Sequence, residues 1–188
     1  MEAITHFLPK DSKTDMTGEL FFLTIASVGM SLTGFVTIVA VFLSHSEKRE
    51  WLPQDVAGLQ LMVEHSLAAV LFGLLPSATS LLIHNEHILW RSVSAALALM
   101  FLFELLIQIN RVKICSERGA APRRFKTLLF VWFPMSFVVA VIQIFNFTIW
   151  ATAFAYAIGI LWLLLAAGIQ FLHFTSYFGM AVDRHGQG

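Results

Sequence analysis

Two glutamates, Glu64 and Glu104, stand inside long apolar stretches of this sequence. A charged side chain in a hydrocarbon layer costs at least ~2.5 kcal/mol on insertion scales, so such a residue is a candidate for function. A carboxyl group in a medium of low dielectric exchanges protons closer to neutral pH than it does in water. The two residues therefore predict a cation or proton site within a membrane.

Other polar side chains fall near these glutamates when the apolar stretches are read as helices. At a rise of about 1.5 Å per residue, Glu64 and Glu104 both lie roughly 10–12 Å below the same membrane surface. Residues three or four positions apart share a helix face. The site predicted on this basis comprises Glu64, Glu104, Gln108, Gln60, Gln170 and His173.

Two other interpretations of the carboxylates stay open at this stage. The polar groups can bond to one another and hold the helices together, as polar side chains do in membrane bundles. Alternatively, Glu104 pairs with Arg111 at the edge of the apolar layer.

Histidines offer a weaker pattern. His65 follows Glu64 but points about 100° away from it on a helix. His65 and His173 fall at one level, as two haem ligands would, and His84 and His87 are three residues apart. Neither pair is a complete ligand set, so the sequence predicts no cofactor and no metal site.

The first apolar stretch carries a face of small residues in place of charges. Thr24, Ser27, Ser31 and Gly34 recur at spacings of three or four. Small faces let helices approach closely in lipid, where packing drives association. The same hydroxyls could line a wet pore in an oligomer. Both interpretations, a packing face and a pore-lining face, are kept.

These residues are positioned by apolar helices. The chain has 188 residues, of which 57% are hydrophobic and 13% charged, and its mean hydropathy is +0.76. About 20 apolar residues span a bilayer as a helix. The sequence therefore predicts an all-α transmembrane bundle of five spans at residues 20–43, 56–83, 88–110, 127–146 and 149–174. The second span is long enough to be either tilted or broken at Pro76.

Basic residues predict the orientation of this bundle. With five spans, nine Lys and Arg fall on one side: Lys48, Arg49, Arg111, Lys113, Arg118, Arg123, Arg124, Lys126 and Arg184. Only Lys10, Lys13 and Arg91 fall on the other. This asymmetry predicts an outside N-terminus and an inside C-terminus. Residues 1–19 form a polar N-terminal segment, 20–178 the transmembrane domain and 179–188 a C-terminal tail.

The predicted function follows from the polar layer and the lack of a soluble domain. We expect a homo-oligomeric channel or small transporter in a bacterial inner membrane that passes a cation, a proton or a small solute. The alternative is a non-transporting accessory or assembly subunit, or a membrane effector. Phosphate-binding and nucleophile motifs are missing, which predicts no enzymatic activity. The formal net charge of zero gives no reason to expect nucleic acid, and lipid is the expected surrounding.

Overall fold

The computed structural model describes residues 12–44, 53–117 and 123–185, and the side chains within 20–41, 58–110 and 132–172. This part of the chain forms five α-helices and one π-helical turn, with no strand. The elements are α1 (Ser12–Ser44), α2 (Pro53–Ser80), α3 (Glu86–Glu117), α4 (Arg123–Phe145), η1 (Asn146–Trp150) and α5 (Ala153–His185).

Five segments of these helices are long and apolar enough to cross a membrane: Leu20–Val41, Gly58–Ser80, Glu86–Asn110, Trp132–Trp150 and Ala153–Leu172. The prediction of an all-α fold with five helices that are long and apolar enough to span a membrane is confirmed for the described residues. The orientation of the bundle stays a prediction, because the side chains of the nine basic residues that support it lie outside the described part.

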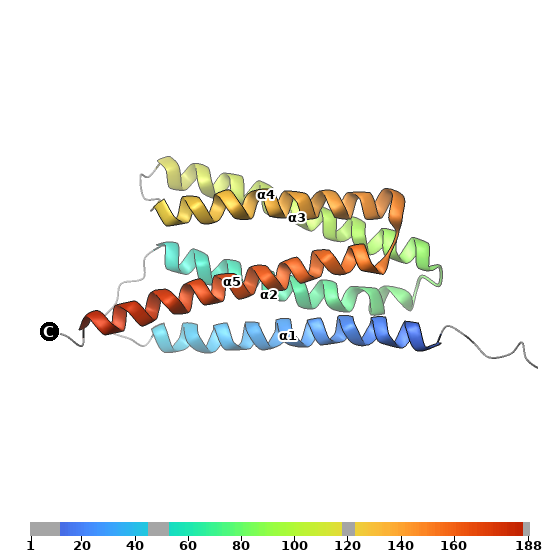
Figure 1. Ribbon diagram of the computed structural model, residues 1–188, viewed down its shortest axis with the longest axis horizontal. Coiled ribbons are helices and arrows are strands. Elements are labelled where there is room, and N and C mark those ends of the chain that lie inside the picture. Colours follow the sequence, from blue (N-terminus) through green and yellow to red (C-terminus); the bar gives the residue numbers. More distant parts are fainter. Residues whose placement is uncertain (1–11, 45–52, 118–122, 186–188) are drawn as a thin grey trace, which may run out of the picture.

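Successive helices run antiparallel along the long axis of the bundle (Figure 1). Helices α2, α3, α4 and α5 form a ring in which each contacts the next and α5 returns to α2. Helix α1 packs outside this ring against α2 and α5. The η1 turn and the α2–α3 connection lie at one end, here named the η1 end (Figure 1).

Glycines bring α1 close to α2. A Cβ on Gly29 would lie 3.0 Å from the Ser66 carbonyl oxygen, and one on Gly73 would lie 3.2 Å from the Phe22 carbonyl oxygen. Small residues at such crossings are typical of helix packing in lipid. The side of α1 that packs against the ring is therefore the one that carries Phe22, Ala26 and Gly29.

Pro76 lies inside α2, and the helix continues through it. Proline has no N–H to donate to the carbonyl four residues earlier, which here belongs to Phe72. The Tyr156 hydroxyl of α5 donates to that carbonyl oxygen at 2.7 Å. A side chain from another helix thus replaces the missing hydrogen bond, and of the two predicted alternatives the break at Pro76 does not occur.

Two predicted boundaries differ at the η1 end. Helix α2 ends at Ser80 instead of residue 83, and Asn85 caps α3 by accepting from the amides of His87 and Ile88. Helix α5 begins at Ala153 instead of residue 149. The π-helical turn η1 and Ala151, which adopts the left-handed conformation with φ of 51°, lie between α4 and α5. The sequence predicts a turn here between spans ending at 146 and starting at 149, but not its extension to residue 152, because Ile149, Trp150 and Ala151 are apolar.

Candidate functional site

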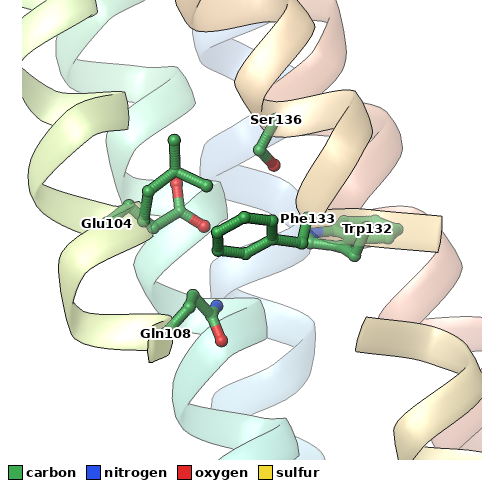
Figure 2. Close-up of a pocket in the computed structure, with 6 residues that line it drawn as sticks. Glu104, Gln108, Trp132, Phe133 and Ser136 are labelled. Carbon is green, nitrogen blue, oxygen red and sulfur yellow. The ribbon is translucent and has the colours of Figure 1, made fainter. Parts of the chain in front are cut away.

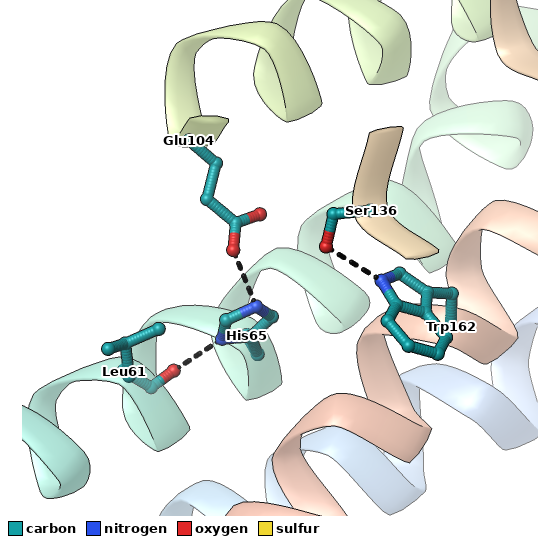
Figure 3. A network of polar contacts seen from close by, with 5 residues as sticks. All are labelled: Leu61, His65, Glu104, Ser136 and Trp162. Carbon is teal, nitrogen blue, oxygen red and sulfur yellow. Dashed lines mark hydrogen bonds and ion pairs between the residues drawn. The ribbon is translucent and has the colours of Figure 1, made fainter. Parts of the chain in front are cut away.

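The shortest contact between ionisable side chains in the described part joins α2 to α3. Nε2 of His65 lies 2.7 Å from Oε1 of Glu104. The His65 side chain is 3% exposed and that of Glu104 is 16% exposed. Figure 3 shows the two side chains reaching across the space between their helices. The pair is therefore a buried, close contact inside the apolar spans.

The second ring nitrogen of His65 determines where the protons lie. Nδ1 is 2.7 Å from the carbonyl oxygen of Leu61, one turn earlier on α2. A carbonyl oxygen only accepts, so Nδ1 must carry a hydrogen. A neutral imidazole that is protonated at Nδ1 has only a lone pair at Nε2. A hydrogen bond between Nε2 and Glu104 therefore requires a further proton between them, held by either the imidazole or the carboxyl group.

Aromatic rings from α4 and α5 enclose this pair. The ring of Trp132 meets that of His65 edge-on, with centroids 6.2 Å apart, and Trp162 packs against Trp132 at 5.0 Å. The indole N–H of Trp162 donates to the Ser136 hydroxyl at 3.2 Å (Figure 3). The α2–α3 pair is thus shielded by indoles.

A small pocket opens on the Glu104 side of the pair. Glu104, Leu105 and Gln108 of α3 line it together with Trp132, Phe133 and Ser136 of α4. Its volume is about 10 Å³, close to the space that one water molecule requires. Figure 2 shows the carboxyl group, the amide and the hydroxyl converging beside the Phe133 ring.

Glu64 lies in a different environment, although it precedes His65 in α2. Its side chain is exposed on the outer surface of the bundle, and Nε2 of Gln60 donates to its Oε1 at 2.8 Å. The 100° step between neighbouring residues on a helix turns His65 inward and Glu64 outward. The two glutamates lie at a similar depth along the bundle. Glu104 of α3 contacts His65 on the inward face of α2, whereas Glu64 lies on the outward face of α2.

The remaining residues of the predicted polar layer are spread over the bundle. Gln108 is buried and lines the pocket. Gln170 is half-buried on α5, and its Oε1 has no hydrogen-bond partner within the described part. His173 belongs to α5, but its side chain lies outside the described residues, as does that of Arg111, the predicted edge partner. Of the six predicted site residues, the structure brings Glu104 together with Gln108 at the pocket and Gln60 together with Glu64 on the outer surface of α2.

The hydroxyl face of α1 points away from the other helices. Thr24, Ser27, Ser31 and Gly34 are exposed, and a Cβ on Gly34 would meet nothing within 4 Å. The hydroxyls of Thr24, Ser27 and Ser31 donate to carbonyl oxygens one turn earlier in α1. This face is therefore unused for packing within the chain.

A second polar cluster surrounds Asn146 at the η1 end. The Asn146 side chain is fully buried. Its Nδ2 donates to the Ser94 hydroxyl at 2.7 Å and to the Thr152 carbonyl at 3.0 Å, and its Oδ1 accepts from the Thr152 amide at 2.8 Å. Arg91 donates to the Thr148 carbonyl at 3.1 Å. These bonds fasten the α4–α5 turn to α3.

His65 is not among the site residues predicted from the sequence, although the spacing of residues on α2 indicates that it faces inward. Met62, His65, Ala69 and Gly73 recur at helical spacing, and all four are buried. That periodicity puts His65 on the inward face of α2. The partner of His65 required the structure, because no local pattern relates position 65 to position 104.

The histidines noted in the sequence have different surroundings in the structure. Among the described residues, no group of three or more His, Cys, Asp or Glu side chains could hold a metal ion. Both ring nitrogens of His65 are engaged, by Leu61 and Glu104. His84 and His87 are exposed at the η1 end.

Comparison with known proteins provides no functional assignment: the chain matches no protein-family model, no curated protein and no solved structure.

Proposed function

We propose that the chain is a membrane transport protein whose carried or coupled ion is the proton, with His65 and Glu104 as the proton-binding pair. The observation that carries this proposal is the double engagement of His65. The Leu61 carbonyl fixes a hydrogen on Nδ1, so the 2.7 Å contact with Glu104 is favourable only while another proton is present.

The loaded pair has no net charge. It is either an imidazolium beside a carboxylate or a neutral imidazole beside a carboxylic acid, and one proton shift along the contact interconverts the two forms. Loss of that proton leaves a lone pair on Nε2 facing a carboxylate, with a net charge of −1 in an apolar layer. Both effects are unfavourable, so unloading pushes the two side chains apart.

This repulsion links proton binding to helix position. His65 belongs to α2 and Glu104 to α3, so opening of the contact loosens one edge of the four-helix ring. A proton taken up on one side restores the contact, and one released on the other side opens it again. Glu64, one residue from His65, adds negative charge beside the pair and raises its preference for a cation.

Proton flux into proteoliposomes tests the proposal. The purified chain is reconstituted with a pH-sensitive dye inside the vesicles, and a potassium diffusion potential drives the proton. We expect acidification above that of empty vesicles, and a loss of about a hundredfold for Glu104→Gln and for His65→Gln, since both remove a group that exchanges the proton. Flux that is unchanged in both variants would overturn the assignment of the pair.

Glu104→Gln is an informative substitution because it preserves the contact. The introduced amide can donate to the neutral Nε2 of His65, so the α2–α3 junction keeps a hydrogen bond while the titratable carboxyl group is lost. Glu86→Gln is the matched control, since Glu86 is an exposed carboxylate at the start of α3. Its flux should equal that of the parent.

Association of several copies is part of the proposal, with the hydroxyl face of α1 as the contact. Support comes from the exposure of Thr24, Ser27 and Ser31, together with the open space around Gly34. Native mass spectrometry should show an oligomer that Gly34→Leu dissociates. Gly168→Leu is the control, because a Cβ at Gly168 also meets nothing within 4 Å. A monomeric parent would contradict this part of the proposal.

A second candidate function is that of an accessory subunit which transports nothing. The close packing of aromatic side chains near the η1 end favours this candidate. Phe22, Trp90 and Tyr156 have ring centroids within 5.9 Å of one another, and Tyr156 is fully buried. Proton flux at the level of empty vesicles, together with a protein that co-purifies in fixed ratio, would favour this candidate.

A further inference from the structure

The pocket beside Glu104 contains an unpaired hydrogen-bond donor. Trp132 is 8% exposed, and its indole N–H has no hydrogen-bond partner among the described residues. Leaving a buried donor unpaired is unfavourable. In Figure 2 the indole nitrogen lies on the side of the ring that faces Glu104. An acceptor bound in this pocket would therefore satisfy the indole N–H.

Other polar groups of the pocket complement that donor. Oε1 of Glu104 is taken by His65, and Figure 3 shows the second carboxyl oxygen turned toward Ser136. The Ser136 hydroxyl accepts from Trp162, which leaves its own hydrogen to donate. One donor from Trp132, one acceptor from Glu104 and one hydroxyl from Ser136 thus converge on one space.

We propose that the Glu104 pocket binds a single water molecule, which accepts from the Trp132 indole and relays protons to and from Glu104. Buried waters make about three hydrogen bonds, which is the number that the three side chains provide. The volume of about 10 Å³ excludes most larger ligands. The relay role rests on the proposed function, whereas the water site itself does not.

The relay is a balanced proton exchange. On release, the neutral carboxyl group of Glu104 rotates so that the oxygen carrying the proton faces the bound water. It then gives this proton to the water, which passes one of its own protons to the next water toward the end of α3. On uptake, the same steps run in reverse. Gln108 lies one turn beyond Glu104 on the same face of α3 and lines the pocket, so it stands beside this exit. Trp132 acts as a positioning residue, because it orients the water and never holds the proton.

An isosteric replacement isolates the indole N–H. Incorporation of 3-benzothienylalanine at position 132 keeps a bicyclic aromatic ring against His65 and Trp162 and removes only the donor. We expect proton flux to fall about tenfold, the order of one lost charge-positioning hydrogen bond. The same replacement at Trp90, which packs against Tyr156 near the η1 end, should leave flux unchanged.

Radiolytic hydroxyl-radical labelling tests the water site independently of flux. A side chain beside an ordered buried water is labelled despite its low exposure. Trp132 should be labelled several-fold faster than Trp162, which is 9% exposed and already donates to Ser136. Equal, slow labelling of both indoles would overturn the water site.

The outcomes separate this inference from the proposed function. If Glu104→Gln abolishes flux but benzothienylalanine at position 132 leaves it unchanged, the relay is wrong and the proton-binding pair stands. If the parent shows no flux, the proposed function and the relay role fail, and labelling at Trp132 alone decides whether the pocket holds water.

Discussion

The two polar clusters of the bundle have opposite hydrogen-bonding character. Around Asn146, the side-chain donors and acceptor of that residue are matched by Ser94 and Thr152 whatever the pH. Around Glu104, the contact with His65 requires a proton, and the nearby Trp132 donor has no partner in the described part of the chain. The Asn146 side chain is fully paired and makes its surroundings rigid, although Nε of Arg91 in the same cluster has no partner within the described part. The His65–Glu104 contact has a second state, which it reaches when its proton leaves. The comparison indicates that the η1 end holds the fold and that the His65–Glu104 region can change.

The largest expected effect on stability is at Asn146. Asn146→Leu removes the bond to Ser94 of α3 and the bonds to Thr152 that close the α4–α5 turn, and it leaves their partners unpaired. We expect a loss of about 3 kcal/mol in the free energy of unfolding, equal at acidic and neutral pH because none of these groups titrates there. Unfolding in mixed micelles measures it. Unimpaired stability would show that the η1 end does not hold the fold.

Tyr156→Phe should cost about 1 kcal/mol, the usual net value of one hydrogen bond. The lost bond joins the hydroxyl to the Phe72 carbonyl that Pro76 leaves unpaired. A double-mutant cycle sharpens the test. In a Pro76→Ala background the restored backbone N–H can bond to that carbonyl, so the cost of Tyr156→Phe should shrink. An undiminished cost would mean that Tyr156 acts by packing alone.

Ser94→Ala should cost somewhat less, about 0.6–1 kcal/mol on the scale of bonds inside membrane bundles. Ser94 accepts from Asn146 at 2.7 Å. Ser92→Ala provides the control from the same helix, because Ser92 is exposed and its hydroxyl only donates to the Ile88 carbonyl. Equal unfolding free energies for the two variants would argue against a stabilising role for the Asn146–Ser94 bond.

The smallest expected effect concerns Glu64. Glu64→Gln should reduce proton flux by less than about threefold, since the Glu64 carboxylate bonds to Gln60 on the outward face of α2 and acts on the pair only through space. If Glu64→Gln and Glu104→Gln reduced flux equally, the difference in burial between the carboxylates would not govern their roles.

Much of the fold could be predicted because hydrophobic length is a local property. Five apolar stretches of sufficient length predict five spanning helices, whichever neighbours each helix packs against. Pro76 and the η1 turn show the limit of such reasoning. Whether a proline breaks a helix depends on what satisfies the freed carbonyl, and here that is Tyr156, a residue from a different helix.

The candidate site was predictable in part for the same reason. Glu104 and Gln108 were recognised from their rarity in apolar segments and their shared helix face. Glu64 and Glu104 looked equivalent by that criterion, because depth along a helix follows from counting residues. Which of them faces a partner depends on helix rotation, which packing sets: Gly29 and Gly73 bring α1 against α2 and turn Glu64 outward.

The sequence by itself therefore determined the number of apolar helices, the composition of each helix and the presence of carboxylates in the apolar layer, since these depend on composition along the chain. Only the tertiary structure decided that Glu104 meets His65, that the Trp132 N–H beside them is unpaired among the described residues, and that the hydroxyl face of α1 stays outside the ring. Such contacts join positions far apart in the chain, and side-chain packing between helices selects them.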